Sequence, residues 1–208
     1  LLLLCACRSP GSAPRAAGSG VLLLRAAADG APTQATLEQA AERILSSDVA
    51  FFGELHDNQA GHDFYAALAE RVLALARERG RPVCLSLEMF ERDTQDLIDG
   101  YLAGRLTEQE FLAQARPWPD YARHYRPLVE AFRRAGGAVL AANVPRRVAA
   151  RIGREGLESG RGSVFAAHGV DLRDGEYKRR FFDTMSAMAG HGMAMSPASL
   201  ERFYAAQA

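Results

Sequence analysis

Three apolar runs along the chain are each followed by polar residues or glycine. They cover residues 48–53, 82–88 and 138–143, and each is largely continuous rather than alternating in hydrophobicity. Continuous runs of this length are typical of strands that are buried on both faces of a parallel sheet. The pattern therefore predicts three buried strands at these positions.

Segments with helical periodicity lie between the predicted strands. Thr36 is expected to cap a helix that ends near Ser47, and residues 60–79 form a long amphipathic pattern that ends at Gly80. Further helices are predicted over residues 92–103, 107–115, 120–135 and 176–189. Two more are expected, one with Pro145 at its first position and one that starts at Ser196-Pro197. Strands that alternate with helices at this spacing predict an α/β fold, with a mostly parallel sheet and helices on both faces.

The first 33 residues differ in composition from the rest. Leu1 to Leu4 resemble the end of a signal peptide, and the following Cys5-Ala6-Cys7 resembles a bacterial lipobox with Cys7 as the lipidated residue. Residues 8–33 are rich in Ala, Gly, Ser and Pro, which predicts a flexible tether, and the apolar residues 21–24 within it predict a short edge strand. The main domain is expected over residues 34–208. The alternative is that the apolar N-terminus is a wrongly assigned start.

Composition narrows the class of protein. The chain has 208 residues, with 25 Lys and Arg against 25 Asp and Glu, so nothing favours binding to nucleic acid or to an anionic membrane surface. Aromatic residues make up 8% of the sequence, which argues further against a single-stranded nucleic acid binder. The three cysteines form no CxxC pair, so neither a zinc knuckle nor a disulfide framework is indicated.

Polar side chains follow all three predicted strands. Glu54 and His56 follow the first strand, Glu88 ends the second and Asn143 ends the third. Because ligands bind beyond the carboxyl ends of parallel strands, these side chains are expected to converge on one rim of the sheet. This rim is the candidate functional site.

A carboxylate and an imidazole two residues apart can ligate a divalent metal, act as an acid–base pair or hold polar groups of a ligand. The candidate metal ligands are Glu54, His56, His62 and Glu88, and the first two are also the candidate catalytic pair. His62 lies six residues after His56, which is not the spacing of a helical zinc motif. The alternatives are a loop-capping network for Glu54 and His56, and an ion pair between Glu88 and an arginine after the third strand.

Two further clusters could contribute to a site. Residues 118–127 combine aromatic rings, His124 and arginines, and a tyrosine there could ligate haem iron. The segment 191–195, from His191 to Met195, follows two other methionines and could line an apolar pocket. The alternatives are a helix whose aromatics pack on the sheet and a methionine-rich core patch.

The chain resembles a known family in several of these motifs. Residues 53–58, 87–90, 125–127, 142–147 and 191–196, together with the lipobox-like start, are similar to the ChaN-like haem-binding uptake lipoproteins of the Tiki superfamily, which also includes TraB-like proteins and erythromycin esterases. The similarity runs from about residue 36 to the last residue. Compared with the family, the chain looks like a fragment that lacks the C-terminal part of the fold.

The resemblance implies a haem-binding lipoprotein of the bacterial envelope, in the outer membrane, that takes part in iron and haem uptake. Haem would be held in a homodimer by a tyrosine ligand, for which Tyr125 and Tyr204 are the candidates, with His124 and His191 as further haem-binding residues. Contact with outer-membrane uptake machinery would follow. The alternative that the superfamily implies is a metal-dependent esterase or peptidase that uses Glu54 and His56.

Overall fold

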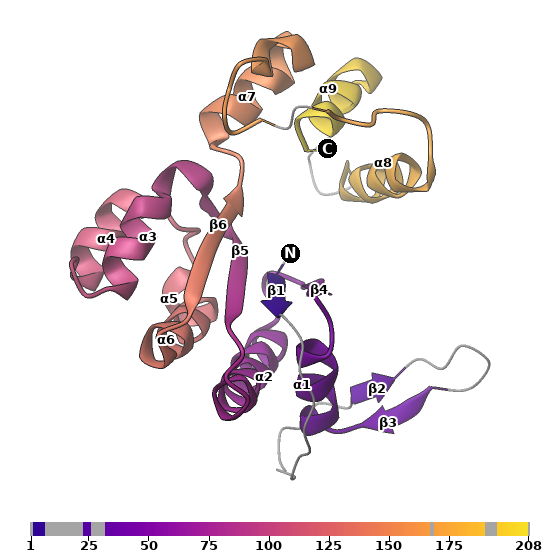
Figure 1. Cartoon of the computed structure of the whole chain (residues 1–208). Helices are drawn as coiled ribbons and strands as arrows, with labels where there is room; N and C mark the ends of the chain where they lie inside the picture. The colour runs from indigo at the N-terminus through magenta and orange to yellow at the C-terminus, as the bar shows by residue number, and fades with distance from the viewer. Residues whose placement is uncertain (1, 7–22, 26–31, 167–168, 190–194, 208) are drawn as a thin grey trace. The chain divides into compact units, whose positions relative to one another are not determined.

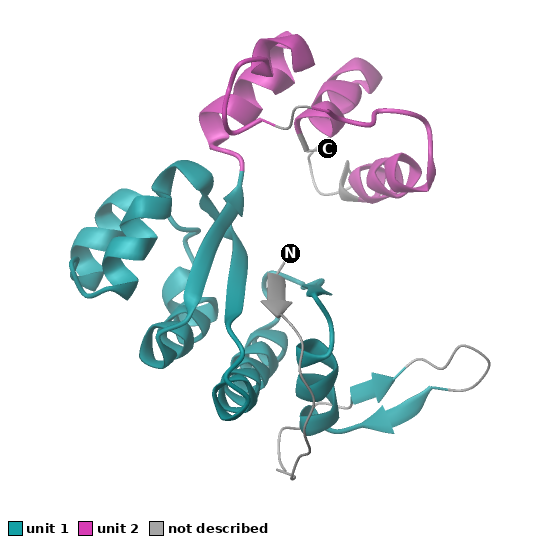
Figure 2. Cartoon of the chain, in the orientation of Figure 1, with its two compact units in different colours: residues 1–143 teal, residues 144–208 magenta. Residues whose placement is uncertain are grey.

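The computed structural model describes residues 2–6, 23–25, 32–166, 169–189 and 195–207 (Figure 1). The chain divides into two compact units, residues 1–143 and 144–208 (Figure 2). The predicted lipid-bearing Cys7 and most of the predicted tether lie outside the described residues. Among the helices that are described, none combines the length and the hydrophobicity that crossing a membrane requires.

The first unit is built around a four-stranded sheet with the order β4-β1-β5-β6. Its strands are β1 (Leu2–Ala6), β4 (Val49–Phe52), β5 (Val83–Glu91) and β6 (Ala138–Asn143). β5 and β6 pair in parallel, whereas β1 runs antiparallel to both β4 and β5. The three strands predicted from the sequence therefore run in the same direction, which confirms the predicted α/β class, with β5 and β6 as the directly paired parallel strands.

The position of β1 was not predicted. The segment that resembles the end of a signal peptide forms a strand between β4 and β5, and its residue Cys5 is level with Val49 on one side and with Cys84 on the other. The first two predicted strands are therefore not direct neighbours. A tertiary pairing of this kind leaves no local signal in the sequence, because any short apolar run can add to a sheet.

The prediction that β4 is buried on both faces is wrong. Its burial alternates, and the side chain of Phe51 is 68% exposed. β6 also alternates, with Val139 buried and Leu140 exposed, whereas most of β5 is buried. Leu3 of β1 is level with Phe51 on one side and with Ser86 on the other, and Ser86 is level with Leu140. Residues that are level across neighbouring strands share a face of the sheet, so Phe51 and Leu140 lie on the same face. A continuous apolar run therefore does not distinguish a central strand from an edge strand.

Helices flank the sheet in the first unit (Figure 1). They are α1 (Leu37–Leu45), α2 (Gln59–Glu78), the 3₁₀ helix η1 (Arg92–Thr94), α3 (Gln95–Leu102), α4 (Glu108–Ala115), α5 (Tyr121–His124) and α6 (Arg126–Ala135). Thr36 caps α1 in a capping box with Gln39, as predicted. The core joins the sheet to the helices through residues such as Leu85, Val139 and Phe132.

The single helix predicted over residues 120–135 is two helices in the structure. α5 ends at His124 and α6 begins at Arg126, with Pro127 in the first turn of α6. Proline has no backbone N–H to donate, so it cannot make the hydrogen bond that one continuous helix would need there, and the chain bends at this point. The bend gives Tyr125 a position between the two helices, which matters for the site.

Gln95 of α3 protects the free edge of β6. Its side-chain Nε2 donates to the carbonyl oxygen of Val139 at 2.9 Å, and its Oε1 accepts from the backbone N–H of Ala141 at 2.8 Å. One side-chain amide thus makes the two hydrogen bonds that a neighbouring strand would make.

A small hairpin and a helical unit complete the described structure. β2 (Leu23–Arg25) pairs antiparallel with β3 (Thr33–Ala35), so part of the predicted edge strand at 21–24 is a strand, in a separate two-stranded sheet. The second unit contains α7 (Arg146–Glu155), the 3₁₀ helix η2 (Leu157–Gly160), α8 (Glu176–Ala189) and α9 (Pro197–Gln207). Pro145 is the N-cap of α7 rather than its first residue.

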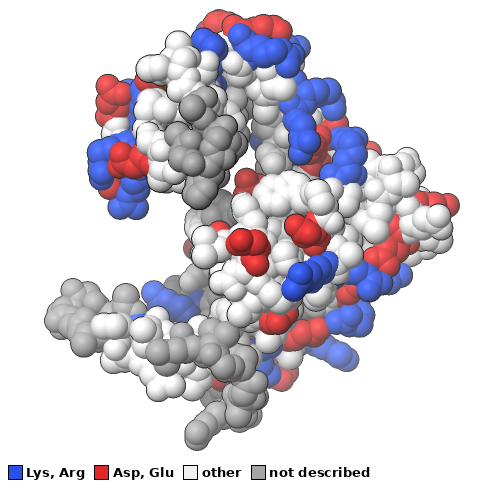
Figure 3. All heavy atoms as spheres, turned by 180° about the vertical axis from the view of Figure 1, so that it is seen from behind, with Lys and Arg blue, Asp and Glu red and all other residues white. Residues whose placement is uncertain are grey.

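Acidic and basic side chains are mixed on the molecular surface. Figure 3 shows blue and red atoms close together, in keeping with the formal net charge of zero.

Candidate functional site

The candidate site lies where β4 ends and α2 begins. Glu54 follows the last residues of β4, and its side chain is almost fully buried. Asn58 caps α2 by accepting from the backbone N–H of Gly61 at 3.2 Å, and this cap sets the course of the loop between the strand and the helix. His62 lies in the first turns of α2, and its side chain contacts the loop before the helix at the backbone oxygen of His56. The structure thereby brings Glu54, His56 and His62 together, as the sequence predicts.

One oxygen of Glu54 accepts two hydrogen bonds. Oε1 lies 2.8 Å from Nδ1 of His56 and 2.7 Å from the hydroxyl of Tyr125, which is the donor of the second bond. An ionised carboxylate can only accept, so Nδ1 of His56 must carry the proton. Neutral His56 consequently has its free lone pair on Nε2.

The surroundings of Glu54 favour its ionised form. Burial alone would raise its pKa, but the hydrogen bonds from Tyr125 and His56 and the nearby imidazole of His62 outweigh burial, so the pKa of Glu54 lies below the usual 4.5. The pKa of Tyr125 is raised far above its usual value by burial, by its hydrogen bond to Glu54 and by the charges of Glu54 and Glu88. The predicted site residue Glu88 is therefore near Tyr125. At neutral pH, Glu54 is therefore a carboxylate and Tyr125 a neutral phenol.

His62 is held from two sides. Its Nε2 lies 3.0 Å from the backbone oxygen of His56 and donates to it, and its Nδ1 lies 3.7 Å from Oε2 of Glu54. Its ring stacks on that of His124, with the centroids 4.2 Å apart and the planes 7° from parallel. Within the described structure, Nδ1 of each ring is buried without a hydrogen-bond partner. These two histidines form a packed layer behind Glu54.

The predicted metal role gains no geometric support. Among the described residues, no group of three or more His, Cys, Asp and Glu side chains is arranged to hold a metal ion. Three of the four predicted ligands, Glu54, His56 and His62, lie together, but His62 and His56 use one ring nitrogen each for a hydrogen bond within the site. A divalent metal at this site stays a prediction.

A cavity of about 460 Å³ opens beside Glu54. It is lined by Gly53, Glu54, Leu55, Asn58, Gly61, His62 and Tyr65. The hydroxyl of Tyr65 donates to the backbone oxygen of Gly53 at 2.5 Å. Sequence reasoning missed Tyr65, although its position three residues after His62 puts both side chains on the same face of α2, which is the signal that could have found it.

Outside this cavity, the site presents apolar and imidazole surface to solvent. The side chain of His56 is 58% exposed and Leu55 is 71% exposed. The ring of Trp118 meets that of His56 edge to face, with the centroids 4.9 Å apart. The exposed Leu55 and the partly buried Trp118 lie beside an imidazole with a free nitrogen. This surface suits a large planar apolar ligand that carries a metal ion to accept the lone pair of that nitrogen.

The other predicted residues are dispersed. Tyr204 is in the second unit, where it is buried against Phe181 with the ring centroids 5.3 Å apart. His191 lies outside the described residues. Asn143 ends β6 level with Glu91 rather than with Glu88, because the register of β5 shifts between Leu87 and Glu91. The predicted rim is thus confirmed around Glu54 but not around Asn143.

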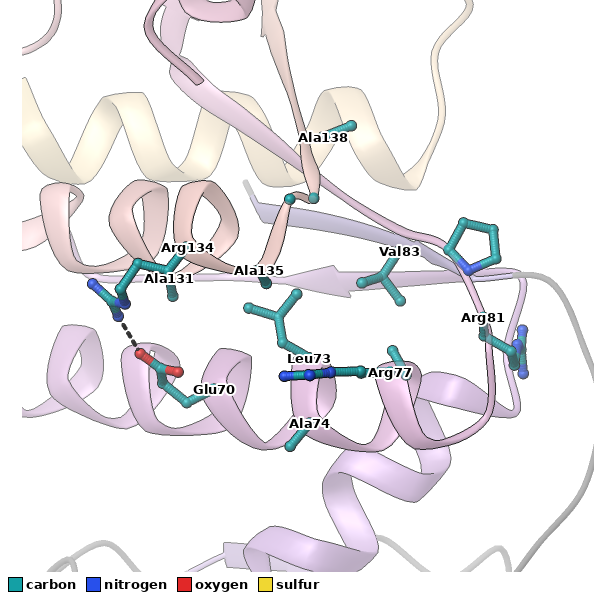
Figure 4. A pocket seen from close by; sticks show the side chains of 14 residues that line it. Glu70, Leu73, Ala74, Arg77, Arg81, Val83, Ala131, Arg134, Ala135 and Ala138 are labelled. Atoms are coloured by element: carbon teal, nitrogen blue, oxygen red, sulfur yellow. Dashed lines mark hydrogen bonds and ion pairs between the residues drawn. The ribbon is translucent and has the colours of Figure 1, made fainter. Parts of the chain in front are cut away.

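A larger cavity, of about 790 Å³, lies at the opposite end of the strands (Figure 4). It is bounded by the start of β5 and of β6 and by the last turns of α2 and α6, and Arg134 pairs with Glu70 beside it. Ligands of parallel sheets bind at the carboxyl ends of the strands, and this cavity is at the amino ends. The smaller cavity at Glu54 is therefore the better candidate.

Comparison with known proteins identifies one family. A family model described as "Haem-binding uptake, Tiki superfamily, ChaN" matches residues 40–208, which is most of the chain and includes every residue of the site around Glu54. Searches of curated proteins and of solved structures found no match.

Proposed function

Because the chain belongs to the haem-binding uptake family ChaN of the Tiki superfamily, we propose that it binds haem and serves iron and haem uptake in the bacterial envelope. The observation in the structure that carries the proposal is the exposed surface of Leu55, which lines the Glu54 cavity, and of the neighbouring His56. Haem requires apolar surface for its ring and a donor atom for its iron, and both are present there.

The residues around this surface also offer a partner for the carboxylates of haem. Haem carries two carboxylates, and Arg123 on α5 lies within reach of the same loop, since its Nε donates to the side-chain oxygen of Gln59 at 2.5 Å. Arg123 is exposed and can exchange that neutral partner for a carboxylate, with which its hydrogen bond is stronger. When bound, haem supplies the iron that the proposed uptake function would deliver.

The family resemblance predicts tyrosine as the iron ligand. The side chains of Tyr125 and Tyr204 are only 1% and 2% exposed, so either would have to become accessible before it could reach iron. His124 is likewise buried against His62, and the same condition applies to its predicted contact with haem. These roles stay predictions that spectroscopy of the haem complex can decide.

Titration of the full-length protein with hemin tests the proposal. We expect a shifted Soret band that saturates at a fixed ratio of haem to protein. A surface mutant such as Arg161→Ala, whose ion pair with Glu158 is exposed on both sides, is the matched control and should titrate like the wild type. A full-length, folded protein that leaves the hemin spectrum unchanged would contradict the proposed function.

We also propose that Cys7 is lipidated and anchors the protein to the outer membrane. Maturation there would remove residues 1–6 and with them β1 (Leu2–Ala6), which lies between β4 and β5. β4 and β5 run in the same direction, so they could then pair directly as parallel neighbours. Membrane fractionation of cells that express the wild type or Cys7→Ser tests the anchor. Equal amounts of both proteins in the membrane fraction would contradict it.

A homodimer that shares haem, and delivery to or from uptake machinery in the outer membrane, complete the proposal. Both rest on the family alone. Light scattering coupled to size-exclusion chromatography, with and without hemin, measures the mass of the complex. A mass that stays at that of one chain in both conditions would exclude the dimer.

The second candidate is a hydrolase, and one observation favours it. The hydrogen bond from Nδ1 of His56 to Glu54 orients an exposed imidazole with a free Nε2, which is the arrangement of a general base. Esterase and peptidase screens of the purified protein, with elemental analysis for bound metal, test this role. Activity that survives in His56→Ala would exclude it.

A further inference from the structure

We infer that the larger cavity, at the amino ends of β5 and β6, is a second binding site and that its ligand is an aliphatic carboxylate. The inference goes beyond the proposed haem function and does not depend on it. Three features of the cavity support it: the hollow that small residues leave at the ends of two helices, an aliphatic wall, and an excess of arginine over carboxylate in the lining.

Small residues keep the cavity open. Ala131 and Ala135 of α6 line it, and neither has a side-chain atom beyond Cβ. The chain then turns at Gly136, which has a φ of 67°, and an added Cβ on Gly137 would lie 2.8 Å from Cδ1 of the fully buried Phe132. Because both positions of this turn favour glycine, no side chain fills the hollow there. Its volume of about 790 Å³ lies within the range of about 300–1,000 Å³ that is usual for small-molecule sites.

One wall of the cavity is aliphatic. Leu73 of α2 and Val83 of β5 are buried, and Figure 4 shows their side chains directed toward each other. Among the residues described around the cavity, none is aromatic and none is His, Cys or Met. The cavity therefore offers neither a ring for stacking nor a ligand for haem iron. A flexible aliphatic chain suits this wall, and a porphyrin does not.

Arginines dominate the charge of the lining. Arg77, Arg81 and Arg134 border the cavity, and Glu70, the acidic residue among the described lining, is already paired with Arg134. Arg77 is exposed, and within the described structure its guanidinium group has no carboxylate partner. Figure 4 shows its side chain extended along α2 beside Leu73. A guanidinium group next to an aliphatic wall can bind a carboxylate through two parallel hydrogen bonds while the chain of the ligand lies on the wall.

Arg81 adds a buried positive charge at the turn between α2 and β5. It is only 8% exposed, and its Nη1 donates to the backbone oxygen of Leu45. Its Nε and Nη2 are buried without a hydrogen-bond partner in the described structure. A buried guanidinium group with unused donors is costly, and an anion in the adjacent cavity would offset part of that cost. The lining as a whole therefore favours a ligand with a negative head group.

The two helix ends at the cavity do not cancel this preference. Carbonyl groups in the last turns of α2 and α6 would repel an anion if they were free, but they accept from the backbone N–H groups of Gly80, Arg81, Gly136 and Gly137. Arginines in a last turn also stabilise the helix dipole, and this is the alternative role for Arg77 that an experiment has to separate from ligand binding.

Calorimetric titration of the full-length protein with dodecanoate, below its critical micelle concentration, tests the site. We expect saturable binding to a single site. Dodecanol has the same chain without the charge and should bind at least about 10-fold more weakly. In methyl NMR spectra, the signals of Leu73 and Val83 should shift as dodecanoate is added.

Two substitutions and one control locate the ligand. Ala135→Leu fills the cavity from α6, and the larger side chain does not overpack the core because Ala135 is exposed. Arg77→Gln keeps a polar side chain but removes the charge. Each should weaken dodecanoate binding about 10-fold. Arg43→Gln is the control, since Arg43 is also an exposed arginine in the last turn of a helix, α1, but does not line the cavity. It should leave the affinity unchanged.

Several results would overturn the inference. They are no saturable binding in the wild type, equal affinity for dodecanol, and equal losses of affinity in Arg77→Gln and Arg43→Gln. Undiminished binding in Ala135→Leu would also overturn it, because the ligand would then lie elsewhere. Thermal denaturation of each variant confirms that it is folded.

Hemin separates this site from the proposed function. Ala135→Leu should titrate with hemin like the wild type, and dodecanoate should not displace bound hemin. Displacement would place both ligands at one site and overturn the inference. A protein that binds dodecanoate at the cavity but leaves the hemin spectrum unchanged would contradict the proposed function alone.

Discussion

The hydroxyl of Tyr125 donates a 2.7 Å hydrogen bond to Oε1 of Glu54, which precedes it by 71 positions in the chain. Glu54 belongs to the loop after β4, and Tyr125 lies at the bend between α5 and α6. The bond therefore ties the candidate site to the helical layer, and it fixes the oxygen that also accepts from His56.

Tyr125→Phe should destabilise the protein. The substitution keeps the ring but removes a buried hydrogen bond to a charged group, for which a loss of about 1.5–3 kcal/mol in the free energy of unfolding is typical. Urea denaturation measures the difference. Tyr177→Phe is the matched control, because its hydroxyl is on the surface, and it should change the free energy of unfolding by less than about 0.5 kcal/mol. Equal losses in both variants would show that the bond to Glu54 contributes nothing specific.

Stability should fall in acid partly because of Glu54. Its pKa is lower in the folded protein than the usual 4.5, so its contribution is present above that value and is lost as the pH falls through the lower folded pKa. Urea denaturation at a series of pH values from 6 downward, at a spacing of about half a unit, measures the loss. In Glu54→Gln the titrating group is gone, so the curve should be flatter below the usual pKa. Curves of the same slope would argue against the lowered pKa.

The ion pair between Arg71 and Glu38 should contribute far more to the free energy of unfolding than the pair between Arg134 and Glu70. The first joins α2 to α1, and both of its side chains are mostly buried, whereas the second is exposed at both ends. Arg71→Ala leaves Glu38 buried without its partner, and about 3 kcal/mol of stability should be lost. Arg134→Ala should cost less than about 1 kcal/mol. Comparable losses in thermal or urea denaturation would contradict the difference in burial.

Gln95→Ala should weaken the edge of the sheet. It removes the two hydrogen bonds to Val139 and Ala141, at about 1 kcal/mol each, and leaves the edge of β6 open to other chains. We expect a loss of about 2 kcal/mol and earlier aggregation in light scattering. Gln114→Ala is the control, since its amide makes one exposed 3.3 Å bond within α4. Aggregation at the same rate in both variants would sink the proposed protection of the edge.

Direct pairing of β4 with β5 after removal of residues 1–6 can be tested with a disulfide. Val49 and Cys84 are both level with Cys5 of β1, so they lie two strand spacings apart, at roughly 9–10 Å. A disulfide requires Cα atoms within about 7 Å. Val49→Cys should therefore form a disulfide with Cys84 under oxidation only in a chain that lacks residues 1–6. Mass spectrometry of peptides detects the bond, and its formation in the longer chain would contradict the arrangement.

Most secondary structure could be predicted from the sequence because its signals are local. The capping box at Thr36 and the apolar period of residues 60–79 fix α1 and α2. The bend at Tyr125 was missed, although Pro127 gave a local signal for it. The exposure of Phe51 could not be predicted, because burial of a strand face depends on which elements cover it and not on its own residues.

The sequence by itself determined that Glu54, His56 and His62 would meet, because the end of a strand and the start of the next helix are close in any βα unit. It also determined the family, since the motifs are contiguous in the chain. Only the tertiary structure decided that Tyr125 shares an oxygen of Glu54 with His56, and that His56 is exposed while Tyr125 is buried. The physical reason is that these relations arise from packing α5 and α6 beside α2, between residues that are far apart in the sequence.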